Sequence, residues 1–369
     1  MRKMEITKYL EKLDEIIDLK HLEESKNLQE DAWDYKPIKK YPVILISMDD
    51  MSKEKFNFSD WPDFTYEEIY NDKEKMLLSE LKPIYEGAVL KDDKIYTIRA
   101  NYGIGGIPSL FGCKIHQRGD SYPWVEHITS LDEIKKIIKN GVPEIKNDFV
   151  EKIVETEFFY KNILSKYKNL NKTVKITLPD VQGPFNIATE ILGVSIFTMV
   201  YDYPDILKDL LEIITETYIK YARYHKEIIG EDLNNGYHFF YRLKVGGVRI
   251  CEDNGLSLSP DMYKEFCQPY NIKVLNEFGG GYILLCGNPH HVIDIILNTP
   301  GVEAITYWSD KVEDLLKIYD KAASKKVPIL WYGMIPDKYR SKIKTGIIIK
   351  QVIKSFDEGK KYLKDSFLS

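Results

Sequence analysis

Carboxylate, thiol and imidazole side chains follow two β-branched runs of this sequence. Glu252 and Asp253 come directly after one run, Cys286 ends another, and His290 and His291 follow that cysteine closely. A thiolate, an imidazole and a carboxylate can hold Zn²⁺ and leave its fourth position open. The pattern therefore predicts a zinc site that combines the thiol with one histidine and one carboxylate.

Each of these residues also has a purely structural alternative. Cys286 follows three aliphatic residues and could be a small buried apolar side chain. His291 opens a helical pattern, where a neutral imidazole could cap the helix. Glu252 and Asp253 are adjacent, so on a strand they point to opposite faces and at most one faces a pocket directly.

Polar and aromatic side chains end the other β-branched runs as well. Arginine binds carboxylates through two parallel hydrogen bonds, and aromatic side chains bury flat apolar surfaces. The pattern predicts a pocket for a small molecule that is bulky, partly anionic and partly flat. The substrate-binding residues that we expect are Arg99, Asn101, Tyr102, Gln182, Arg249, Asn288 and Trp331.

Short strand patterns alternate with longer helical patterns from about residue 90 onward. The strand candidates span residues 94–100, 173–178, 247–251, 282–286, 302–307 and 327–331, with a weaker one at 346–349 and an earlier one at 43–47. Such alternation predicts a parallel sheet with crossover helices. Seven or eight units in about 250 residues fit a (β/α)₈ TIM barrel, whose catalytic groups lie at the strand ends. A doubly wound open sheet is the alternative.

The predicted organisation is an N-terminal helical extension over residues 1–90, packed on a barrel formed by residues 91–369. Within residues 91–369, several residues mark the ends of the predicted helices. Ser130 and Glu133 form a capping box, and Pro204 and Gly230 bound the longest helical pattern. Pro269 predicts a kink in a later helix.

Composition excludes several classes of protein. The 52 Lys and Arg against 57 Asp and Glu give a net charge of -5, so we expect no nucleic-acid partner. The four cysteines form no C-x-x-C pair. The sequence lacks P-loop, H-E-x-x-H and G-x-S-x-G motifs, and Pro108 interrupts the only dinucleotide-like glycine cluster. No signal peptide is visible and the apolar run 193–200 is far too short for a membrane span, so we expect a cytoplasmic protein.

The same strand ends resemble the uroporphyrinogen decarboxylase superfamily, and in particular its cobalamin-dependent methyltransferases. The segments that carry the likeness are 180–193, 202–204, 252–253, 258–260, 269–270 and 286–288, in the order and at the spacing of that family. The likeness covers roughly residues 90 to 365. It implies a (β/α)₈ barrel with N-terminal helices, and it implies pairing into a homodimer.

The resemblance implies methyl transfer between a small substrate or a thiol and a corrinoid, which a corrinoid protein would carry. The catalytic residues would be Cys286, Glu252, Asp253 and His291. Leu284 stands where those methyltransferases have a histidine ligand. Zinc would therefore use a shifted set of Cys286, His291 and Glu252, or the pocket would be metal-free. The alternatives are decarboxylation of a tetrapyrrole, and a barrel that binds a tetrapyrrole or corrinoid without transforming it.

Overall fold

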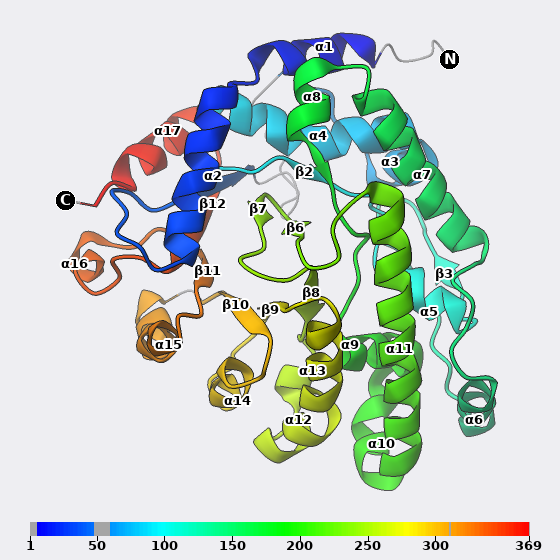
Figure 1. Cartoon of the computed structure of the whole chain (residues 1–369). Coiled ribbons are helices and arrows are strands. Elements are labelled where there is room, and N and C mark those ends of the chain that lie inside the picture. Colours follow the sequence, from blue (N-terminus) through cyan, green and yellow to red (C-terminus); the bar gives the residue numbers. More distant parts are fainter. Residues whose placement is uncertain (1–5, 48–59, 310, 369) are drawn as a thin grey trace.

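The computed structural model describes residues 6–47, 60–309 and 311–368. A parallel sheet of six strands has the order β1-β12-β11-β10-β9-β8, and helices surround the strands (Figure 1). The strands are β1 (Val43–Ser47), β12 (Ile347–Ile353), β11 (Ile329–Tyr332), β10 (Val302–Tyr307), β9 (Gly281–Leu284) and β8 (Val248–Cys251). This architecture confirms the predicted α/β class. Within the described ranges, hydrogen bonds do not close the sheet into a ring.

Six further strands form three separate pairs. β2 (Thr97–Ile98) and β5 (Lys175–Ile176) pair in parallel. Two antiparallel pairs, which the sequence did not predict, are β3 (Ile115–His116) with β4 (Trp124–Val125), and β6 (Tyr237–His238) with β7 (Tyr241–Arg242). Each of the eight predicted strand segments overlaps a strand of the structure, although β2 and β5 are much shorter than expected and β12 is longer.

Helices begin and end at the residues that the sequence predicted. The Ser130 side chain accepts a hydrogen bond from the Glu133 N–H, and the longest helix ends at Gly230. The kink expected at Pro269 is a break between α12 and α13 at Cys267. The helices are α1 (Thr7–Ile16), α2 (Leu19–Trp33), α3 (Tyr66–Asn71), α4 (Lys73–Leu90), α5 (Gly106–Leu110), α6 (Leu131–Asn140), α7 (Asp148–Leu164), α8 (Lys168–Thr173), α9 (Pro184–Leu192), α10 (Ile196–Asp202), α11 (Pro204–Ile229), α12 (Pro260–Phe266), α13 (Gln268–Glu277), α14 (Ile293–Leu297), α15 (Val312–Ser324), α16 (Asp337–Arg340) and α17 (Phe356–Asp365).

The main sheet is buried on both faces. In β12, Ile347 and Ile349 belong to the apolar cluster that the helices cover, whereas Ile348 belongs to a second cluster with Tyr282 and Leu330. We call the side of the second cluster the inner face. Because side chains alternate along a strand, residues two positions from these also lie on the inner face.

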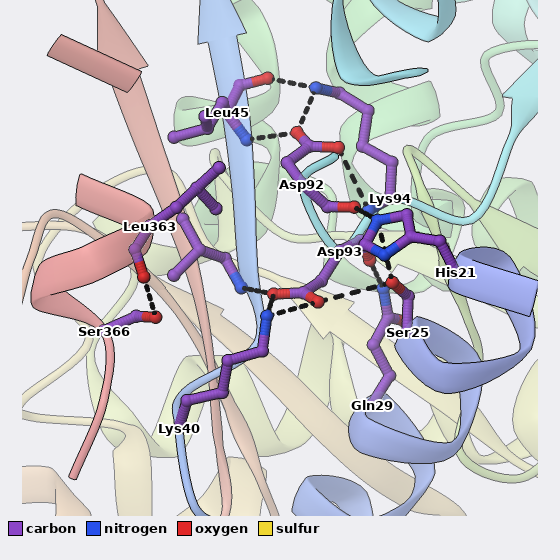
Figure 2. Close-up of polar contacts among 11 residues, drawn as sticks. His21, Ser25, Gln29, Lys40, Leu45, Asp92, Asp93, Lys94, Leu363 and Ser366 are labelled. Atoms are coloured by element: carbon purple, nitrogen blue, oxygen red, sulfur yellow. Dashed lines mark hydrogen bonds and ion pairs between the residues drawn. The ribbon is translucent and has the colours of Figure 1, made fainter. Parts of the chain in front are cut away.

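The free edge of β1 is covered by residues 92–94, chiefly through their side chains, instead of by a neighbouring strand (Figure 2). Asp92 accepts a hydrogen bond from the Leu45 N–H at 2.9 Å, and Asp93 accepts one from the Val43 N–H at 3.0 Å. Lys94 donates to the Leu45 carbonyl. These bonds satisfy backbone groups that would otherwise stay unpaired at an edge. The first 90 residues thus supply one strand of the sheet as well as helices.

One stretch, Pro184–Asp202, is long and apolar enough to cross a membrane by length and composition. It runs through α9 and α10, and 56% of it is buried inside the protein. A core helix passes the same test, so this stretch is only a weak indication of a membrane segment.

Candidate functional site

Cys286 lies just beyond the end of β9 and is the exposed cysteine among the four. Oδ1 of Asp253 accepts a 3.0 Å hydrogen bond from the Cys286 N–H, and Oδ2 lies 3.2 Å from Sγ of Cys251. Partial burial of the thiol, followed by the negative charge of Asp253, raises the pKa of Cys286 to about 12. The thiol is therefore protonated at neutral pH and is a poor nucleophile.

Glu252 points away from Cys286, toward the helices. Its side chain is fully buried between Gly183 at the start of α9 and the segment around Cys267. A Cβ at position 183 would lie 2.7 Å from Oε1 of Glu252, so only glycine fits there. Burial raises the pKa of Glu252 to about 7. The adjacent acids thus face opposite ways, and Asp253 is the one beside the thiol.

The predicted zinc donors do not converge. Nε2 of His291 lies 3.0 Å from the carbonyl oxygen of Leu258, and Glu252 occupies the helix side of the sheet. Across the ranges that the structure describes, no group of three or more His, Cys, Asp and Glu side chains is placed to hold a metal ion. The arrangement of Cys286, His291 and Glu252 does not fit a tetrahedral zinc site, and we derive no reaction step through zinc.

Two arginines from different strand ends share one carboxylate. Nη1 of Arg99 lies 3.1 Å from Oδ2 of Asp180, and Arg249 pairs with the other oxygen. Gln182 also donates to Asp180, at 3.2 Å. Burial opposes ionisation of Asp180, but the two guanidinium charges outweigh it and hold its pKa well below the usual range. Arg99, Asp180 and Arg249 taken alone carry one net positive charge, while Asp63, Glu80, Asp120 and Lys82 also line the cavity next to Arg99.

A cavity of about 370 Å³ lies beside Arg99. Glu80 of α4 accepts hydrogen bonds from the Arg99 N–H and the Asn101 side chain, both at 3.0 Å, and so fixes this wall. The lining also includes Tyr66, His238 and Phe239. Burial lowers the pKa of His238 well below its usual range, and the cations Arg249, Arg99 and Lys350 add to this effect. The imidazole of His238 is therefore neutral.

No local sequence pattern predicted four of these lining residues. Tyr66 and Glu80 lie on helices that precede the alternating strand and helix patterns, which begin at about residue 90. His238 and Phe239 lie in the β6–β7 hairpin. Their position depends on tertiary packing and not on a local motif.

Three predicted substrate-binding residues lie elsewhere. The Tyr102 hydroxyl is 2.9 Å from Oγ1 of Thr156 on α7, in the buried packing of that helix. Oδ1 of Asn288 accepts a hydrogen bond from the His290 N–H and shapes the loop after β9. Trp331 belongs to the helix-facing cluster, opposite to the inner face. The residues that the structure does bring together are Arg99, Asn101, Gln182 and Arg249.

Comparisons with known proteins add no assignment. No family model matches the chain, and a search of curated proteins finds no match either.

Proposed function

We propose that β1, β2, β5, β8, β9, β10, β11 and β12 form the eight strands of a (β/α)₈ barrel whose ladder is interrupted beside β1 and between β5 and β8. All the strand pairs among these eight are parallel, and helices surround them (Figure 1). The carboxylates of Asp92 and Asp93 occupy the edge of β1 where a β1–β2 ladder would run. The resemblance to the uroporphyrinogen decarboxylase superfamily favours the same architecture.

We further propose that the protein is an enzyme that demethylates a small anionic methylated compound and passes the methyl group to a corrinoid held by a partner protein. The observation that carries the substrate class is the Arg99–Asp180–Arg249 cluster. Arg99 lines the cavity and is joined through Asp180 to the buried Arg249, and charge attraction is screened less at such buried groups than at a surface. A carboxylate of the substrate would accept hydrogen bonds from the guanidinium N–H groups that Asp180 does not use.

The cavity favours a substrate much smaller than a tetrapyrrole. Its volume of about 370 Å³ lies at the small end of the roughly 300–1,000 Å³ that ligand pockets span. A tetrapyrrole decarboxylase needs a pocket for a whole macrocycle. This observation places decarboxylation of a porphyrinogen second, and non-catalytic binding of a tetrapyrrole or corrinoid third.

The protonated thiol favours removal of a methyl group over methylation of Cys286. When the methyl–heteroatom bond breaks, its electron pair stays on the heteroatom, which then needs a proton. Cys286 holds a proton at neutral pH and is close enough to Arg249 for that positive charge to act on its pKa. Because its raised pKa makes this thiol a weaker acid than a phenol, the leaving heteroatom would take its proton from solvent, and Asp253 would hold Cys286 as a neutral residue that is not methylated.

The test uses 4-methoxybenzoate as an anionic methyl donor and free cob(I)alamin as the acceptor. Methylcobalamin formation should depend on the protein, fall at least about tenfold in Arg249→Gln, and survive treatment with a zinc chelator. The uncharged methyl ester of the same acid serves as the matched control and should not react. Equal rates for acid and ester, or no methyl transfer from any anionic methyl ether, would overturn the proposal. Release of CO₂ from a carboxylated substrate would favour the decarboxylase instead.

A further inference from the structure

Lys350 is a buried lysine on the inner face of β12. Its side chain is 1% exposed, and it lies two residues from Ile348 of the inner-face cluster. Three aromatic rings surround its ammonium. Nζ lies 4.2 Å from the ring centre of Phe239, 4.9 Å from that of Tyr241 and 5.4 Å from that of Tyr332.

We call these three rings the aromatic cage. They surround Nζ of Lys350 where a counter-ion would otherwise lie. Among the described residues, the structure shows no hydrogen bond or ion pair to this atom. Two other buried lysines differ in this respect, because Lys94 pairs with Asp92 and Lys226 pairs with Glu231. Burial, and then the positive charge of Arg249, lower the pKa of Lys350 to about 7, while Cys286 acts in the opposite direction. A large share of Lys350 is therefore the neutral amine at physiological pH.

The β6–β7 turn is strained where it meets this lysine. Phe239 and Phe240 have φ angles of 43° and 75°, a left-handed conformation that is unfavourable for a bulky residue. The Phe240 N–H donates to Oγ1 of Thr97 at 3.0 Å, and its carbonyl accepts from the Ile95 N–H at 2.9 Å. These bonds hold the turn in place. Phe239 lines the cavity and also packs on the ammonium, so one side chain contacts both.

We propose that Lys350 is a nucleophilic amine that forms an imine with a small anionic aldehyde or 2-oxo acid bound in the barrel interior. The amine lone pair adds to the carbonyl carbon, and the carbonyl oxygen takes up a proton to give a carbinolamine. Loss of water, which carries away that oxygen, then leaves a C=N bond. The step needs no oxidant or reductant. A desolvated lysine beside another cation is the environment that activates such amines.

The groups that act on the amine come from every neighbouring element. Arg249 on β8 acts on the charge of Lys350 and would bind the carboxylate of the carbonyl compound, and the ammonium lies over the ring of Tyr332 on β11. His238 on β6 is neutral, and the Cys286 thiol beyond β9 stays protonated. None of these groups is a strong anion that would hold Lys350 in its charged form.

Reductive trapping tests this site without any assay of methyl transfer. The full-length protein is incubated with glyoxylate and sodium cyanoborohydride at pH 7, and the modified lysines are located by peptide mapping. Lys350 should be labelled at least about tenfold faster than the average exposed lysine, because more of it is neutral. Lys94 and Lys226 are the matched controls, since they are buried but paired, and both should stay unlabelled. Excess benzoate should suppress the label on Lys350 alone.

Two results would overturn the proposal. One is labelling spread over exposed lysines with none on Lys350, and the other is an unchanged total label in Lys350→Met. Mapping of the wild-type protein gives an answer even if that variant does not fold. The result is also independent of the proposed demethylation, because labelling of Lys350 can succeed where methylcobalamin does not form.

Discussion

Nη1 of Arg99 lies 3.1 Å from Oδ2 of Asp180, and this ion pair joins the chain beyond β2 to the chain beyond β5. Arg249 binds the other oxygen of the same carboxylate from β8. Asp180 is thus an internal competitor for any anionic substrate, because a bound carboxylate must share the same two guanidinium groups. Occupancy of the site by substrate and retention of the ion pair are opposed.

Asp180→Asn should strengthen the binding of a small carboxylate. The variant leaves both arginines without their counter-ion, so 4-methoxybenzoate should bind about tenfold more tightly in calorimetry. The same change should lower the free energy of unfolding by about 3–5 kcal/mol, because it leaves buried cations unpaired. Asp253→Asn is the control, since Asp253 contacts Cys286 and not these arginines. Weaker binding in Asp180→Asn would contradict the assigned role of the cluster.

Cys286 should react slowly with a disulfide reagent despite its exposure. The pKa of about 12 leaves little thiolate at pH 7.5, so the reaction should run at least about tenfold slower than that of a free thiol. Asp253→Asn should accelerate it, because one cause of the raised pKa is lost. Cys286→Ser supplies the background of the three buried cysteines. A fast reaction in the wild-type protein would mean that Cys286 is largely ionised, and it would favour Cys286 as a methyl acceptor.

The sequence was sufficient to predict which strand ends meet, but not which way each residue faces. Arg99, Gln182 and Arg249 converge because carboxyl ends of parallel strands lie at one edge. The pattern predicts Trp331 in the pocket, whereas Trp331 shares the helix-facing side with Ile329 and Leu330 belongs to the inner face. Parallel strands are apolar on both faces, so composition cannot tell one parity from the other.

The sequence did not predict Lys350 as a site residue, for a related reason. The weak strand pattern at 346–349 stops one residue short of it, whereas β12 continues to Ile353. Nothing in the local sequence indicates that a distant hairpin places Phe239 and Tyr241 over its ammonium. The caged amine results from long-range packing alone.

Glu252→Gln should remove a pH dependence of stability. The folded pKa of about 7 lies above the ordinary glutamate pKa of 4.5. The stabilising effect of the protonated carboxyl is thus full below pH 4.5 and is lost as the pH rises through 7. Between pH 5 and pH 8 the wild-type protein should lose up to about 3 kcal/mol relative to Glu252→Gln, as measured by urea unfolding.

The control for this titration is Glu265→Gln, which removes a half-exposed carboxyl paired with Lys208. It should leave the pH profile unchanged. Parallel stability profiles for wild type and Glu252→Gln would mean that Glu252 stays ionised in the folded protein at pH 5.

Asp92→Asn should weaken the edge of β1. Asp92 and Lys94 are both buried and paired, so the change leaves a buried ammonium without its partner and should cost about 3–5 kcal/mol of unfolding free energy. Glu24→Gln, which breaks an exposed pair with Lys20, should cost less than about 1 kcal/mol. Equal effects in thermal denaturation would show that the carboxylates do not hold this edge.

The most direct test of the account is calorimetric binding of 4-methoxybenzoate and of its methyl ester to the wild-type protein and to Arg249→Gln. The cationic interior predicts that the wild-type protein binds the acid and not the ester, and that the variant loses at least about tenfold in affinity for the acid. Equal affinity for acid and ester, or undiminished binding of the acid by Arg249→Gln, would contradict an anion site built on Arg99, Asp180 and Arg249.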